Sequence, residues 1–328
     1  MKILFCSDTH LGFDFPVRPR IVRRRRGEDF FRNFQTILDH AIEYGVDAVI
    51  HGGDLFFRSK VPLLIVNKAY EMLFEFAEQG IPIFIVPGNH ERSRLPVSIL
   101  TRHPLINIFE KPKTFRLEID GISLGISGFP YTRNIREFFL RIVDRTGWNS
   151  HYSDIKLLCF HQAVEGVKIK NYTFRYGGEV IKSEDLSDQF HCLLSGHIHR
   201  KQVMKFNKGE KEIPVIYSGS TEKTSFQEMD EDKGFYTLEF RQFCDGWKLS
   251  GTEFHKLETR PMVKLKIPDN IRDVNSLKSF LLAQRGNLDK NAILKLECSN
   301  IGILEFFDKN FIRSIFPDTM NFHFRYPK

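Results

Sequence analysis

The first 91 residues alternate apolar runs with helical patterns, and this alternation allows few folds. Residues 1–10, 46–54 and 81–91 each begin with an apolar run of strand length and end in polar residues. Between them, residues 28–44 and 62–80 carry apolar side chains at the spacing of amphipathic helices. This order predicts parallel strands joined by right-handed crossovers, so the chain is expected to form an α/β domain.

Polar side chains follow each of these predicted strands and two later ones, over 155–162 and 190–199. In open α/β sheets, ligands bind beyond the carboxyl ends of the strands, so we expect these side chains to converge at one edge. Oxygen donors and imidazoles without a thiolate favour Mn²⁺, Fe²⁺ or Zn²⁺. Two such ions, about 3.5–4 Å apart, can clamp a phosphate and activate a water. The side chains concerned are Asp8, His10, Asp54, Asn89, His90, Glu91, His161, His197 and His199.

Two histidines stand one residue apart in "SGHIHR", residues 195–200. On an extended chain His197 and His199 would point to the same side. Gly196 has no side chain, which would let the backbone approach a crowded centre. Asp54, in the middle of the order, is the natural candidate for a carboxylate that bridges two ions.

Several of these motifs together resemble the calcineurin-like metallophosphoesterase superfamily. The superfamily motifs are "SDTHLG" (7–12), "GGDLF" (52–56), "PGNHE" (87–91), "FHQ" (160–162) and "SGHIHR" (195–200). A narrower resemblance rests on "SDTHLG" with the aromatic helix after it, "YSGSTEKTSF" (217–226) and "KGFYTLEF" (233–240). By these motifs, residues 1–258 resemble the SbcD-type subunit of DNA double-strand-break repair nucleases, within that superfamily.

The resemblance implies a four-layered α/β/β/α sandwich with a dinuclear metal site. One ion would be held by Asp8, His10, Asp54 and His199, and the other by Asp54, Asn89, His161 and His197. His90 matches the family's catalytic histidine, which is not a ligand. It would assist the departing oxygen while a hydroxide bridging the metals attacks phosphorus. Mn²⁺ is the ion we expect, with Fe²⁺, Zn²⁺ and Mg²⁺ as alternatives.

A second, smaller domain is expected after a boundary near residue 258. Residues 259–328 show a β-α-β-α-β pattern and resemble, in pattern and position, the small α+β capping domain of that family. The resemblance implies contact of this cap with DNA. It also implies a homodimer and an SMC-like ATPase partner of the SbcC type, although no amphipathic tail for that partner is visible.

The basic balance of the chain is compatible with a nucleic-acid partner. The net charge is +7, and six arginines occupy nine positions at 18–26. That run is either a solvated loop or a patch that contacts phosphates. The candidate DNA contacts are Arg23, Arg24, Arg25, Arg58, Arg92 and Arg94.

The cysteines and the hydropathy indicate a cytoplasmic protein. Five cysteines contain no CxxC pair, and three lie in apolar runs, which is typical of buried reduced thiols. No apolar run is long enough to cross a membrane, and the N-terminus lacks the pattern of a signal peptide.

Three functions remain in competition. The first is a metal-dependent DNA exonuclease or endonuclease of the DNA repair type. The second is a phosphodiesterase or phosphatase on small phosphoesters. The third is a metal-bound DNA-end scaffold with little catalysis, against which His90 and the full ligand set argue. Phe57 departs from the resembled family, where His or Asp often follows the "GDLF" stretch, so the exonuclease activity could differ.

Overall fold

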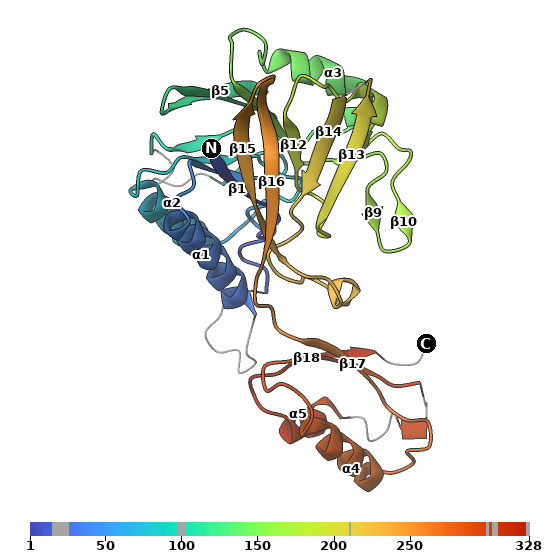
Figure 1. Cartoon of the computed structure of the whole chain (residues 1–328). Helices are drawn as coiled ribbons and strands as arrows, with labels where there is room; N and C mark the ends of the chain where they lie inside the picture. Colours follow the sequence, from blue (N-terminus) through green and yellow to red (C-terminus); the bar gives the residue numbers. More distant parts are fainter. Residues whose placement is uncertain (15–25, 97–102, 210, 300–301, 304–307, 326–328) are drawn as a thin grey trace. The chain divides into compact units, whose positions relative to one another are not determined.

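The computed structural model describes residues 1–14, 26–96, 103–209, 211–299, 302–303 and 308–325 (Figure 1). The chain forms two compact units. The first comprises Met1–Phe13, Gly27–Thr224 and Glu231–Glu258, and the second comprises Asp14–Arg26, Ser225–Asp230 and Thr259–Lys328. The short segment Ser225–Asp230 therefore leaves the first unit and returns to it within six residues.

The first sheet of the larger unit has six strands, and its centre is parallel as the alternating pattern predicts. In sheet order the strands are β16 (Gly246–Lys256), β15 (Gly234–Phe243), β1 (Lys2–Cys6), β2 (Ala48–His51), β3 (Ile83–Ile85) and β4 (Ile106–Ile108). β1, β2, β3 and β4 are parallel neighbours, and β15 pairs antiparallel with both β1 and β16.

The second sheet also has six strands. The strands in order are β13 (Gln202–Lys208), β14 (Lys211–Tyr217), β12 (Cys192–Ser195), β7 (Ile155–Phe160), β6 (Ile122–Gly128) and β5 (Lys113–Ile119). The sequence Asp120-Gly121 is a typical hairpin turn, and both residues have positive φ where they join β5 to β6. Two small pairs lie beside it: β8 (Ala163–Val164) with β11 (Val180–Ile181), and β9 (Lys168–Ile169) with β10 (Tyr172–Thr173).

Helices cover the outer faces of the two sheets, which confirms the four-layered sandwich. Successive strand residues face opposite sides, so one face of each sheet joins the core between them, with Phe5 and Ile50 packing against Leu157. α3 (Ile135–Arg145) packs Phe139 with Leu158 on the far side of the second sheet. α1 (Gly27–Glu43) and α2 (Leu63–Ala77) lie side by side (Figure 1), and Phe34 of α1 contacts His51 of β2.

The second unit follows the predicted β-α-β-α-β pattern. Three parallel strands, β17 (Met262–Lys266), β18 (Ile293–Glu297) and β19 (Asn321–Arg325), pack with α4 (Val274–Arg285) and α5 (Lys309–Ile315) around one apolar cluster. Asp273 caps α4 by accepting a hydrogen bond from the Ser276 amide. Phe226 lies 5.4 Å from His323, ring to ring, so Ser225–Asp230 packs within this unit.

The burial of the cysteines agrees with the apolar runs in which three of them lie. All five cysteines are free; Cys6, Cys159, Cys192 and Cys298 are buried and Cys244 is exposed. Among the described residues, no helix is long and apolar enough to cross a membrane.

Candidate metal centre

The loops that follow β1 and β2 lie beside each other, and their polar side chains point toward the same region. The Asp8 amide donates to the Gly53 carbonyl at 2.8 Å, and the His10 amide donates to the Asp54 carbonyl at 3.0 Å. Asp8, His10 and Asp54 all have positive φ, between 46° and 53°. Such conformations cost free energy in non-glycine residues and cluster at functional sites. Here they aim a carboxylate, an imidazole and a second carboxylate at the same point.

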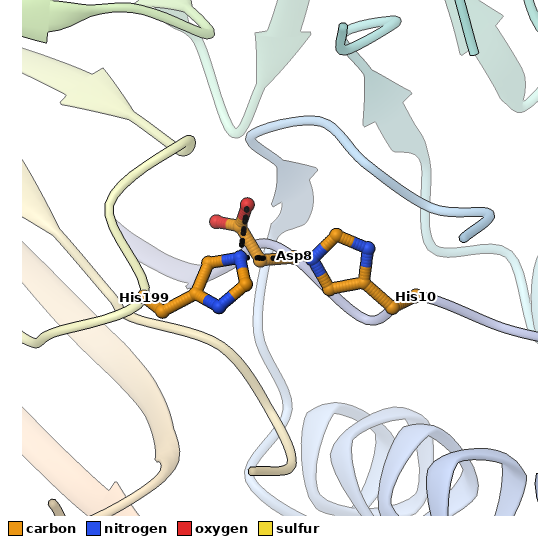
Figure 2. Close-up of side chains that lie close together, drawn as sticks. All are labelled: Asp8, His10 and His199. Carbon is orange, nitrogen blue, oxygen red and sulfur yellow. Dashed lines mark hydrogen bonds and ion pairs between the residues drawn. The ribbon is translucent and has the colours of Figure 1, made fainter. Parts of the chain in front are cut away.

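One group of donors consists of Asp8, His10 and His199 (Figure 2). The Nε2 atoms of His10 and His199 are 2.9 Å apart, and His199 Nε2 lies 3.8 Å from a carboxylate oxygen of Asp8. Asp8 and His10 are fully buried, whereas the His199 side chain is 26% exposed. Residues from the ends of β1 and β12 thus meet, although 189 positions separate His10 from His199.

A second group of donors surrounds the amide oxygen of Asn89. His161 Nε2 and His197 Nδ1 each lie 3.0 Å from Asn89 Oδ1, and His161 Nε2 lies 3.3 Å from Asp54. Asp54 also lies in a donor group with Asp8 and His161, and in another with His10 and His90. Asp54 therefore stands between the two groups, as expected of a carboxylate that serves both.

His90 lies at the open side of this cluster. Its amide donates to Asp54 at 2.9 Å, and its Nδ1 is 2.6 Å from the Phe57 carbonyl, to which it donates when protonated. The Nε2 atom is then left facing the cluster, 3.8 Å from Asp54, on a side chain that is 35% exposed. The backbone carbonyl of Phe57 thus orients His90, and the ring of Phe57 packs against Phe13 and His10.

Burial and opposite charges shift the pKa values of the cluster strongly. Burial alone would raise the pKa of Asp54, but the charge and hydrogen bond of His161 hold it below its ordinary value. The same pairing overcomes the effect of burial on His161 and raises its pKa to about 9. Burial, reinforced by the charge of His161, lowers the pKa of His197 to about 3. Burial and then His199 lower the pKa of His10 well below its usual range. These shifts favour neutral imidazoles at His10 and His197 and a charged pair of Asp54 with His161.

Three buried polar residues hold the ligand loops. Glu91 accepts hydrogen bonds from the amides of Phe56 at 2.7 Å and Gly88 at 2.6 Å, as expected of an orienting residue. His51 lies 3.0 Å from the Thr9 hydroxyl and accepts from the Gly53 amide, in agreement with a structural role. Ser7, which is not among the candidate site residues expected from the sequence, donates to Asp8 at 2.6 Å. Its position directly before Asp8 was the only signal of this role.

Glycines bring the backbone close to the cluster where any side chain would collide. A Cβ atom on Gly196 would lie 2.4 Å from the Gly52 carbonyl oxygen and 2.7 Å from His161 Nδ1. A Cβ atom on Gly88 would lie 2.1 Å from an Asp54 oxygen. The close approach predicted for Gly196 is therefore confirmed, and Gly88 makes a second one.

The residues fit a pair of divalent ions. Two buried carboxylates, four imidazoles and an amide oxygen converge, and this hard and borderline donor set is typical of such ions. Buried His10 Nδ1 has no hydrogen-bond partner in the described part of the chain. A buried polar cluster of this kind is costly to leave without a ligand, because its lone pairs point at one another.

The arginines expected to contact DNA are only partly described. Arg58, Arg92 and Arg94 are exposed and lie in the loops that carry Asp54 and His90. Arg58 lies over the Phe57 ring at 5.7 Å. Arg23, Arg24 and Arg25 lie outside the described residues.

Comparisons with known proteins agree with this geometry. The DNA double-strand break repair protein Mre11 of Archaeoglobus fulgidus is 27% identical over 92% of this chain, and that of Methanococcus maripaludis is 26% identical over 72%. The Methanosarcina acetivorans Mre11 is 30% identical over 70% of the chain. The chain spans 69%, 62% and 35% of the length of these three relatives, respectively. The model of the calcineurin-like phosphoesterase family matches residues 1–201. The chain therefore belongs to the calcineurin-like phosphoesterase family, whose members hydrolyse phosphoesters at a dinuclear site for divalent metal ions.

Proposed function

We propose that this protein is a Mn²⁺-dependent nuclease that cleaves DNA phosphodiesters, as an exonuclease or an endonuclease of the DNA repair type. The observation that carries the proposal is the pair of donor groups that share Asp54, where strand ends of both six-stranded sheets meet. The Mre11 proteins, to which the chain is similar over most of its length, point to DNA as the substrate.

In the proposed reaction, one set of residues would bind the metal ions and His90 would donate a proton. Two bound divalent ions would neutralise the phosphate oxygens and lower the pKa of the attacking water. Asp8, His10 and His199 would hold one ion, Asn89, His161 and His197 the other, and Asp54 both. His90 has Nδ1 tied to the Phe57 carbonyl, so Nε2 can donate a proton to the departing 3′-oxygen.

The DNA would pass over the exposed rim of the site. Arg58, Arg92 and Arg94 project from the loops that carry the ligands, and the chain has an excess of seven positive charges. We also propose that residues 259–328 act as a DNA-contacting cap, and that the protein works in the cytoplasm as a homodimer with an SbcC-type ATPase. These last proposals rest on family resemblance and on the Mre11 relatives.

A cleavage assay on linear DNA across divalent metals and strand polarities tests the proposal. With Mn²⁺ present the protein should degrade DNA, and His90→Ala should lower the rate by about 10²–10⁴-fold. The variant should still bind Mn²⁺ in calorimetry. His103→Ala is the matched control, because His103 pairs with Glu78 at 3.1 Å and holds no place in the cluster.

Two outcomes would favour the competing functions. If a small aryl phosphodiester is cleaved and DNA never is, the protein is a phosphoesterase for small substrates. If DNA and Mn²⁺ are both bound and neither substrate is cleaved, the protein is a scaffold for DNA ends.

A further inference from the structure

Lys233, the first residue of "KGFYTLEF", is a fully buried lysine that is not among the expected metal ligands. Its ammonium donates to the backbone carbonyl of His199 at 2.9 Å and lies 3.1 Å from a carboxylate oxygen of Glu231. It lies at the entrance to β15, directly before Gly234, and 34 positions from His199. The buried charge is thus directed at the main chain of a candidate metal ligand.

His199 is held on both its backbone and its ring. Its carbonyl accepts a second hydrogen bond, from the Ser220 amide at 3.1 Å, so that Lys233 and Ser220 fix it together. Thr224 Oγ1 lies 3.5 Å from His199 Nδ1, on the side of the ring opposite to His10. A partner on one ring nitrogen sets the tautomer and leaves the other nitrogen for the metal.

A gain in stability is a weak explanation for this lysine. Removing an ammonium group from water is expensive, and buried ion pairs are often no better than apolar residues of the same size. Lys201, which lies 3.2 Å from Asp232, shows the ordinary alternative, since its side chain is 34% exposed. Besides its ion pair with Glu231, Lys233 donates to the His199 carbonyl, and this contact points to a role at the metal centre.

We infer that Lys233, assisted by Thr224, is a positioning residue that sets His199 for the ion shared with Asp8 and His10. The inference rests on the two-ion site of the proposed function. The other donor group is oriented separately, because His161 Nδ1 is 2.8 Å from the Gly52 carbonyl and its Nε2 meets Asn89. Loss of Lys233 should therefore weaken one ion far more than the other.

Calorimetric titration of the full chain with Mn²⁺ alone tests whether Lys233 positions His199. The His199→Ala variant identifies which of the two classes of metal site depends on His199. Lys233→Met keeps most of the side-chain length and removes the charge. It should weaken the His199-dependent class by about tenfold or more and leave the other class within about twofold. Lys233→Arg, which keeps a donor and a charge, should restore most of the loss. Lys201→Met is the matched control and should change neither class.

An equal loss in both classes, or no loss in either, would overturn the inference. If Lys233→Met does not fold, Thr224→Val replaces it, because that change removes only the hydroxyl beside His199 Nδ1. Thr224→Val must then weaken the same single class, and an unchanged titration would equally refute the inference. The titration contains no DNA, so its result does not depend on whether the protein cleaves DNA.

Discussion

Gly196→Ala is expected to disrupt the metal centre by forcing two backbone segments apart. A Cβ atom at this position would lie 2.4 Å from the Gly52 oxygen, whereas real Cβ atoms essentially never come closer than 3.0 Å. The gap between the loops after β2 and β12 must therefore open by at least 0.6 Å, from 2.4 to 3.0 Å. Neither neighbour can yield cheaply, since one is backbone and the other is the buried ring of His161.

Opening this gap should lower both the folding stability and the affinity for metal. Inserting a methyl group into a packed site costs about 1–3 kcal/mol of folding free energy. Each kcal/mol lowers Tm by about 2–4 °C in a domain of around 200 residues. The same movement lengthens the contact between Gly52 O and His161 Nδ1, now 2.8 Å, which orients a metal-facing imidazole. Loss of such an orienting bond weakens metal binding by about 10–100-fold.

Thermal unfolding and Mn²⁺ titration measure the two effects. Gly251→Ala is the matched control, because its Cβ would meet only Glu239 Cβ, at the ordinary distance of 3.8 Å. We expect Gly251→Ala to keep the Tm and the Mn²⁺ affinity of the wild type. If Gly196→Ala also keeps both, the close packing around His161 is not what the site requires.

Three further predictions concern pH, thiols and charge. Mn²⁺ affinity should rise by up to about tenfold per pH unit as the pH increases toward 9. The reason is that Asp54 raises the pKa of His161 to about 9, and the metal must displace the proton of His161. Calorimetry in two buffers of different ionisation enthalpy would show the release of this proton, and equal heats in both buffers would contradict the prediction. Only one thiol per folded chain, Cys244, should react with a thiol reagent, because the other four are buried; several fast equivalents would count against the described core. Arg58, Arg92 and Arg94 can be replaced by Ala one at a time. Each replacement should lower the magnitude of the slope of the logarithm of the DNA binding constant against the logarithm of salt concentration by about one unit per lost phosphate contact. Unchanged slopes would mean that these arginines do not contact the DNA phosphates.

The sequence predicted the parts of the fold that depend on local patterns. Helical spacing of Phe30, Phe34 and Ile37 placed α1, and Asp120-Gly121 placed the hairpin, because periodicity and turn chemistry are local properties. The sequence also indicated that the polar side chains after the strand ends would lie together. It did not show that these strands divide between two sheets, with β1, β2 and β3 in the first and β7 and β12 in the second.

Other features depend on contacts between distant residues and left no local pattern. Lys233 reads as an ordinary charge before a strand, and only the folded chain places its ammonium beside His199. Ser225–Asp230 continues the "YSGSTEKTSF" stretch without a break in composition, yet it belongs to the second unit. Neither could be predicted, because their partners lie tens of residues away in the sequence.

Counting the Mn²⁺ ions bound per chain is the most direct test of whether Asp54 joins two metal ions into one site. Wild-type protein should bind two equivalents, measured by calorimetry or by metal analysis after gel filtration. His199→Ala and His197→Ala should each lose one class of ion, whereas Asp54→Asn should weaken both classes together, since Asp54 lies between both donor groups. Binding of a single equivalent by the wild type, or two intact classes in Asp54→Asn, would contradict the shared site.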